Sequence, residues 1–155
     1  MIYNYEPEII KEDIKSVTEC IGTGIANPTT LVDSEKEFNK KLKTNTALCN
    51  SGTSALHLSL LILGIGPGDE VICPDMTFAS TWNVVEYVGA KLILADIHED
   101  TWCLTAKSIE EKLTSKTKAV ITVDLFGNSC DYDNIKKVCK KNNIFLIQDA
   151  AESLG

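Results

Sequence analysis

The chain has 155 residues, 44% of them hydrophobic and 24% charged, with a formal net charge of -7. This composition excludes a disordered or collagen-like chain, and the length suits one domain that buries a sizeable core. The acidic balance disfavours nucleic-acid binding, because no concentrated basic patch offsets the repulsion from a phosphate backbone. We therefore expect a soluble globular protein with no nucleic-acid partner.

Targeting and metal-binding signals are also missing from the sequence. The N-terminus lacks a basic segment followed by an apolar run, and no stretch of about 18 apolar residues occurs, which predicts a cytoplasmic protein with no membrane partner. The six cysteines include no C-x-x-C pair, and the two histidines, His57 and His98, lie far apart. We therefore expect neither a metal site nor a disulfide framework.

The first 45 residues are expected to form an N-terminal helical segment. The first helix carries an apolar stripe made by Ile10, Ile14, Val17 and Ile21. This spacing is typical of an amphipathic helix, which Gly22 is expected to end. Residues 24–28 then suggest a loop, and Ser34 is predicted to cap a second helix with Phe38 and Leu42 on one face.

From residue 46 onward, short apolar runs alternate with helical patterns. The runs predicted to be strands are 46–49, 70–73, 91–95, 119–123 and 144–147. The helices predicted between them are 54–63, 79–88, 108–113 and 132–142. Such alternation with almost continuously apolar strands favours an α/β fold, a three-layer α/β/α arrangement around a mostly parallel sheet.

The stretch Asn50-Ser51-Gly52-Thr53-Ser54 lies where a predicted strand ends and a helix begins. The start of a helix presents free N–H groups and a partial positive charge to an anion. Thr53 and Ser54 can add hydroxyl donors to a bound phosphate. Ser and Thr at this position are also typical of ordinary helix caps, and these residues alone leave both interpretations open.

Two other strand ends carry candidate binding residues. Phe78 follows the strand at 70–73 and can offer a flat face to a heteroaromatic ring, although a core aromatic residue would look the same. Asp149 follows the apolar strand at 144–147, where a carboxylate is costly unless it is paired. A pyridinium nitrogen would satisfy it, as would a lysine or the start of a following helix.

Together these stretches resemble the DegT/StrS-type aminotransferases, fold-type I enzymes that use pyridoxal 5'-phosphate (PLP) to aminate keto-sugar nucleotides. Six segments carry the resemblance, in the family's order and spacing: N-S-G-T-S-A-L-H-L, G-I-G-P-G-D-E-V-I, P-D-M-T-F-A-S-T-W-N, Y-V-G-A-K, L-F-G and Q-D-A-A-E-S-L-G. The resemblance extends over nearly the whole chain from residue 46 to residue 155. Within the family, the T-W-C stretch at 101–103 resembles the perosamine-type synthases.

The resemblance implies a cofactor and its contacts. The amides and hydroxyls of Thr53 and Ser54 would hold the PLP phosphate, and Phe78 would stack on the pyridine ring. Asp149 would pair with the protonated ring nitrogen, which lets the ring accept the electrons released when the Cα–H bond of the amino donor breaks. Glu152 would lie near the 3-hydroxyl of the cofactor.

The resemblance also implies that residues 46–155 are the N-terminal part of a PLP-binding large domain, whose remainder and small domain are absent. The family's Schiff-base lysine lies some tens of residues past the aspartate motif, so no catalytic residue is assigned before Gly155. We expect the whole protein to be a homodimeric aminotransferase. Its substrates would be a nucleotide sugar and an amino acid donor such as glutamate, and this chain alone would be inactive.

Three positions depart from the commonest family pattern. Gln148 stands where Glu is usual, Asp124 where His is frequent, and Ala26 where Ser is frequent. Gln148 is expected to face away from Asp149 across the strand, and Asp124 to influence sugar recognition.

Other functions remain open at this point. Some relatives carry histidine in place of the lysine and act as sugar dehydratases. A PLP-fold protein without turnover could serve as a binding or regulatory protein. A flavodoxin-like nucleotide-binding domain fits the length of the chain but leaves the ordered motifs unexplained.

Overall fold

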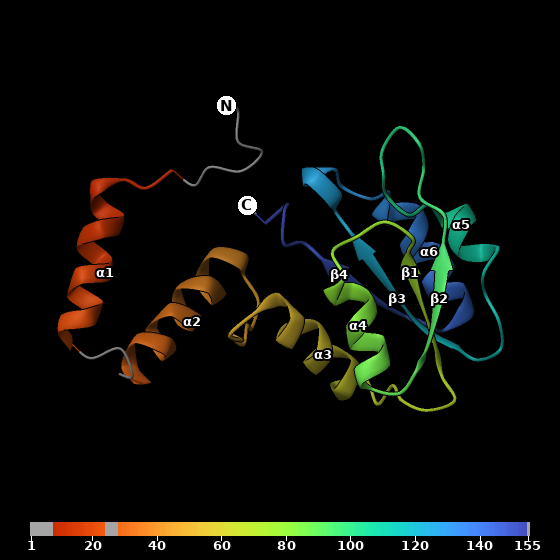
Figure 1. Cartoon of the computed structure of the whole chain (residues 1–155), viewed down its shortest axis with the longest axis horizontal. Helices are drawn as coiled ribbons and strands as arrows, with labels where there is room; N and C mark the ends of the chain where they lie inside the picture. Colours follow the sequence, from red (N-terminus) through yellow and green to blue (C-terminus); the bar gives the residue numbers. More distant parts are fainter. Residues whose placement is uncertain (1–7, 24–27, 155) are drawn as a thin grey trace. The chain divides into compact units, whose positions relative to one another are not determined.

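The computed structural model describes residues 8–23 and 28–154, coloured along the sequence in Figure 1. The chain divides into two compact units, with the boundary between Leu48 and Cys49. The first unit contains α1 (Lys11–Thr23) and α2 (Pro28–Leu42). The second contains the α/β part of the chain, and each unit is described by itself.

The first unit confirms the two expected helices but corrects their ends. α1 continues through Gly22, and α2 begins at Pro28, a residue suited to a first helical position because it lacks an N–H. Ser34 is not a cap, because it lies inside α2 and donates its hydroxyl to the carbonyl one turn earlier, at 2.8 Å. Most of the expected loop, with Ala26, lies outside the described residues.

The predicted strand at 46–49 is wrong. The backbone N–H of Thr46 donates to Asn39 Oδ1 at 2.5 Å, and that of Leu48 donates to Glu35 Oε1 at 3.0 Å. Side chains of α2 thus occupy the backbone donors that a neighbouring strand would need. An apolar run becomes a strand only where another strand lies beside it to pair with its backbone.

The second unit confirms the rest of the predicted alternation. Its helices and strands are α3 (Gly52–Ile62), β1 (Glu70–Pro74), α4 (Ser80–Tyr87), β2 (Lys91–Ala95), α5 (Ala106–Glu110), β3 (Thr117–Val123), α6 (Tyr132–Asn142) and β4 (Phe145–Asp149). A short 3-10 turn, Leu125–Gly127, follows β3. The bounds of β2 and α6 match the prediction, and the others differ from it only at their ends.

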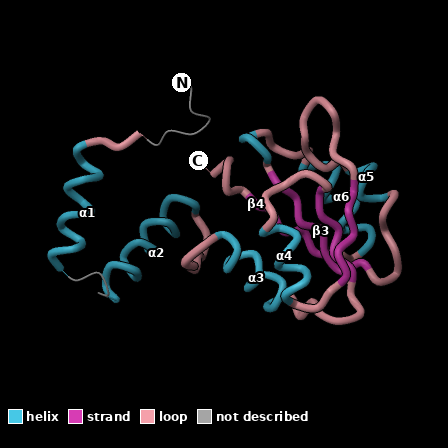
Figure 2. The backbone as a smooth tube through the Cα atoms, viewed as in Figure 1, coloured by secondary structure: helices cyan, strands magenta, loops and turns pink. Residues whose placement is uncertain are grey.

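The strands form one parallel sheet in the order β2-β1-β3-β4, which confirms the predicted α/β class. Figure 2 shows the strands of this sheet in magenta and the helices in cyan. β1 and β3 are the central strands, and all five residues of β1 are buried. β2 and β4 each pair with one strand among the described residues, so they form the two edges of the sheet.

Helices cover both faces of the sheet, because side chains of a strand alternate between its two sides. On one face Val71 and Ile121 pack with residues of α3 and α4. On the other face Ile72 and Val120 pack with residues of α5 and α6. The arrangement in Figure 1 is therefore the expected three-layer α/β/α sandwich.

All six cysteines are free thiols, and four of them, Cys73, Cys103, Cys130 and Cys139, are buried. Cys20 is half-buried and Cys49 is exposed. In the described part of the chain, no group of three His, Cys, Asp or Glu side chains is placed to hold a metal ion. Within the same residues, no helix combines the length and apolar character that a membrane crossing requires.

Candidate functional site

The carboxyl ends of parallel strands meet at one edge of a sheet, and open α/β sheets bind their ligands there. A cavity of about 280 Å³ lies at this edge. Gly52, Ala55 and Ser59 of α3 line one side of it, and Asp149 and Ala150 from the end of β4 line the other. The beginning of α3 and the end of β4 therefore share one cavity, although they are far apart in the sequence.

Ser51 is the residue that caps α3. Its backbone is extended, and its Oγ accepts a hydrogen bond from the backbone N–H of Ser54 at 3.1 Å. The N–H groups of Gly52 and Thr53 have no acceptor among the described residues, and a Cβ at Gly52 would meet nothing within 4 Å. These first-turn groups are therefore open to an anion. The Thr53 hydroxyl is not required for capping.

Asp149 ends β4 as a half-buried carboxylate. Its Oδ1 accepts from the backbone N–H of Ala151 at 3.2 Å, and its Oδ2 accepts from the hydroxyl of Thr81 at 3.5 Å. The ion pairs of the described residues do not include Asp149. A carboxylate that lines a cavity without a cationic partner suits a positively charged ligand.

Phe78 and Glu152, two other predicted site residues, follow the ends of β1 and β4. Phe78 follows β1 with 78% of its surface exposed, and its carbonyl accepts from the N–H of Thr81 at 3.1 Å. Thr81 therefore contacts both the Phe78 backbone and the Asp149 carboxylate. Glu152 is exposed and accepts a hydrogen bond from the backbone N–H of Phe126. Of the predicted site residues, only Asp149 lines the cavity, whereas Thr53, Ser54, Phe78 and Glu152 do not.

Asp124, directly after β3, is only 1% exposed, so its side chain points into the protein and does not face a sugar. Its carboxylate accepts hydrogen bonds from four donors: the backbone N–H of Cys130, and the side chains of Tyr132, Gln148 and Ser153. Burial raises the pKa of this carboxyl, but the donors outweigh that effect and hold the pKa below its ordinary value. A direct contact between this carboxylate and a sugar is therefore not expected, and its influence on sugar recognition stays a prediction.

The expected orientation of Gln148 agrees with these contacts. Gln148 Nε2 reaches Asp124, whereas the Asp149 carboxylate reaches Thr81 at the start of α4, on the other face of the sheet. Thr81 and Ser51 were not predicted as site residues, although both lie inside the quoted motifs. Nothing in a single sequence distinguishes a hydroxyl that contacts a carboxylate from one that caps a helix.

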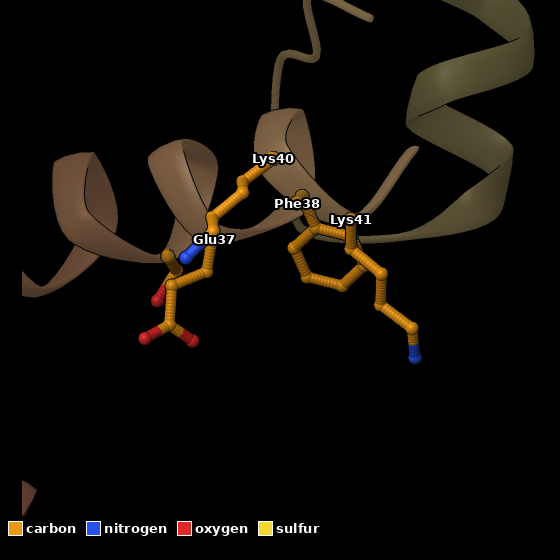
Figure 3. A pocket seen from close by; sticks show the side chains of 5 residues that line it. Glu37, Phe38, Lys40 and Lys41 are labelled. Atoms are coloured by element: carbon orange, nitrogen blue, oxygen red, sulfur yellow. The ribbon is translucent and has the colours of Figure 1, made fainter. Parts of the chain in front are cut away.

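A larger hollow, of about 560 Å³, lies in the first unit. It is lined by Ser34, Glu37, Phe38, Lys40 and Lys41, and the labelled side chains in Figure 3 all project from α2. These residues belong to one face of a single helix and include no buried charged group. The cavity at the carboxyl edge of the sheet is the better candidate, because a helix start with free N–H groups meets a carboxylate that has no cationic partner among the described residues.

Comparison with known proteins agrees with this choice. The DegT/DnrJ/EryC1/StrS aminotransferase family model matches residues 7–155. GDP-perosamine synthase of Escherichia coli O157:H7 is 36% identical over 160 residues, which cover 97% of this chain and 42% of that protein.

Two solved structures are similar over nearly the whole chain. An aminotransferase from Psychrobacter cryohalolentis has a TM-score of 0.91 and 32% identity, covering 99% of this chain and 40% of that one. NtdA from Bacillus subtilis, solved with bound cofactor PMP, has a TM-score of 0.86 and 30% identity, covering 95% and 35%. The chain therefore spans less than half the length of each of these proteins.

Proposed function

Because the chain belongs to the DegT/DnrJ/EryC1/StrS aminotransferase family, we propose that the whole protein is a PLP-dependent aminotransferase. It converts a nucleotide-linked keto-sugar into an amino sugar, with an amino acid such as glutamate as the donor. The observation that carries the proposal is that the Asp149 carboxylate, which has no cationic partner among the described residues, lines the same cavity as the start of α3. The similarity to a GDP-perosamine synthase supports the choice of a nucleotide sugar.

The start of α3 and the end of β4, which meet at the cavity, suit the two ends of PLP. The free N–H groups of Gly52 and Thr53 and the hydroxyl of Thr53 suit its phosphate, and Ser54 lies on the same turn. The Asp149 carboxylate, which has no cationic partner among the described residues, suits the protonated nitrogen of the pyridine ring. When bound, the cofactor supplies an electron sink for the breaking Cα–H bond of the amino donor.

The side chains around Asp149 hold this arrangement. Thr81 and the N–H of Ala151 donate to the carboxylate, and these hydrogen bonds orient its two oxygens. Phe78 presents an exposed aromatic face from the loop after β1 and would cover the ring. Glu152 would accept a hydrogen bond from the 3-hydroxyl of the ring.

The remaining parts of the proposal concern the whole protein. Residues 46–155 form part of a larger PLP-binding domain, and residues 1–45 form a helical segment that precedes it. The lysine that carries the cofactor and much of the sugar pocket lie outside this chain, and the active form is a homodimer in the cytoplasm. The chain alone is expected to lack aminotransferase activity.

A stoichiometric half-reaction tests the function directly. The whole protein, loaded with PLP, is mixed with glutamate in the absence of any sugar, and the 2-oxoglutarate formed is measured. An aminotransferase releases about one 2-oxoglutarate per bound cofactor and then stops, because the amino group has moved to the cofactor. A sugar dehydratase or a regulatory PLP-binding protein would bind PLP without releasing 2-oxoglutarate. A nucleotide-binding protein of similar fold would not bind PLP.

A further inference from the structure

One buried carboxylate closes the segment that carries Asp149 and Glu152. Gln148 Nε2 donates to Asp124 Oδ2 at 2.7 Å, and Ser153 Oγ donates to the same oxygen at 2.8 Å. The two donors are the first and last residues of a segment that we call the 148–153 segment. Residues 149–152 therefore form a loop, and the residues at its two ends are both hydrogen-bonded to Asp124 Oδ2.

Main-chain contacts add to this closure. The N–H of Asp124 donates to the carbonyl of Asp149 at 3.1 Å. Two residues further along, the N–H of Phe126 donates to the carboxylate of Glu152. The chain just after β3 therefore contacts the 148–153 segment at both proposed cofactor residues as well as at its ends.

The other oxygen of Asp124 accepts hydrogen bonds from residues at the start of α6, on the face of the sheet toward which Gln148 also points. Oδ1 accepts from the hydroxyl of Tyr132 at 2.6 Å and from the N–H of Cys130 at 3.0 Å. Tyr132 begins α6 and packs against the hydrophobic core on that face, and Cys130 is part of that core. The carboxylate therefore connects the hydrophobic core on that face to the 148–153 segment.

We propose that Asp124 is a positioning residue for the cofactor site: it fixes the 148–153 segment so that Asp149 and Glu152 are presented to the pyridine ring. The choice of PLP as the ligand rests on the proposed function. The hydrogen bonds of Asp124 are independent of that choice. Asp124 and Gln148 are also two of the three departures from the common family pattern, and here they bond to each other. The more usual histidine and glutamate could make the same contact with donor and acceptor exchanged.

The two oxygens of Asp124 provide a matched pair of variants. Ser153→Ala removes a donor on the segment side, and Tyr132→Phe removes a donor on the core side. Asp124→Ala removes both connections. Asp124→Asn keeps the acceptor for Cys130 and Tyr132, and its amide can donate to Gln148 once the Gln148 amide has turned over.

The experiment measures three properties of each variant in the whole protein: the Kd for PLP, the melting temperature, and hydrogen exchange of the amides in the 148–153 segment without cofactor. We expect Asp124→Ala to weaken PLP binding on the order of tenfold, as supporting partners of bound groups often do. Ser153→Ala should act in the same direction with a smaller loss. Both should speed amide exchange in the segment, and Asp124→Asn should restore most of the affinity.

Tyr132→Phe should lower the melting temperature, but because the N–H of Cys130 still binds Oδ1, it should weaken PLP binding and speed segment exchange much less than Ser153→Ala does. If Tyr132→Phe weakens PLP binding as much as Ser153→Ala, Asp124 is only a stabilising residue and the proposal is wrong. Unchanged exchange and affinity in Ser153→Ala would overturn it as well, even if Asp124→Ala does not fold. If the unmodified protein binds no PLP, the proposed function fails, and segment exchange in the variants still decides the positioning role.

Discussion

At the scale of single residues, we expect cofactor binding to depend most on Asp149. Removing a hydrogen-bonded charge from such a contact costs about 2 kcal/mol, which is on the order of thirtyfold in affinity. We expect Asp149→Ala to weaken PLP binding by about this factor, because the ring nitrogen loses its counter-charge. Asp149→Asn should retain part of the binding and fail in turnover.

PLP titration and initial rates measure these effects, with Asp75→Asn as the control. Asp75 also follows a strand, β1, but it is exposed and accepts only the N–H of Ile97, at 3.3 Å. Its variant should bind PLP as the unmodified protein does. Aminotransferase rates that are unchanged in both Asp149 variants would contradict the role given to this residue.

The depressed pKa of Asp124 predicts a pH dependence of stability. A carboxylate whose folded pKa lies below its unfolded value stabilises the protein above about pH 4, and this contribution is lost as pH falls through the folded pKa. The difference in unfolding free energy between the unmodified protein and Asp124→Asn should therefore be constant near neutral pH and shrink in acid. Urea unfolding at about pH 7, 5 and 3 measures it, and a difference that grows toward acid would contradict the sign.

Residues of the site differ in how far the sequence could predict them. Thr53, Phe78 and Asp149 were proposed as binding residues because each follows a predicted strand inside a recognisable motif, and their roles stay predictions. The contacts of Asp124 could not be inferred, because its donors come from the loop before α6, from α6 itself and from the turn after β4. Only the parallel pairing of β3 with β4 brings these residues together.

At the scale of elements, one residue caps the start of α3 and a different one is proposed to bind the ligand. Ser51 caps the helix, so Ser51→Ala should lower the unfolding free energy by about 1 kcal/mol. Thr53→Val keeps the shape of the side chain and removes a hydroxyl that caps nothing, so it should change stability by less than about 0.5 kcal/mol and weaken PLP binding. Chemical unfolding and PLP titration of both variants test this, and unchanged affinity in Thr53→Val would exclude its hydroxyl as a phosphate ligand.

The strands of the second unit were predicted correctly because each apolar run has a parallel neighbour. The run at 46–49 has the same character and is not a strand, since side chains of Glu35 and Asn39 bind its backbone donors. The misplaced cap at Ser34 has a related cause. A serine before an apolar helical stripe looks the same whether the helix begins there or at Pro28, several residues earlier.

At the scale of the whole molecule, the two open edges of the sheet affect the behaviour of the 155-residue chain by itself. β4 lies at an edge, and its first residue, Phe145, is 49% exposed. Unpaired strand edges with apolar side chains promote association between chains. We expect the chain to self-associate with rising concentration and Phe145→Lys to reduce the association, because a charged residue blocks edge pairing.

Sedimentation velocity over a concentration series measures this association. Tyr87→Lys is the control, since Tyr87 is 60% exposed but belongs to helix α4 and not to a strand edge. It should associate more than Phe145→Lys. A chain that remains monomeric at all concentrations would show that the edges are protected.

Cys49 is the one exposed cysteine among the described residues of the second unit, so its modification can be used to detect the proposed phosphate contact at the start of α3. Cys73, Cys103, Cys130 and Cys139 are buried, and burial raises the pKa of Cys130 to about 12, which suppresses the thiolate that alkylating reagents attack. Cys49 is exposed and lies two residues before the cap of α3. Maleimide chemistry should therefore modify Cys49 first in this unit, and the rate of modification should fall when a phosphate occupies the start of the helix.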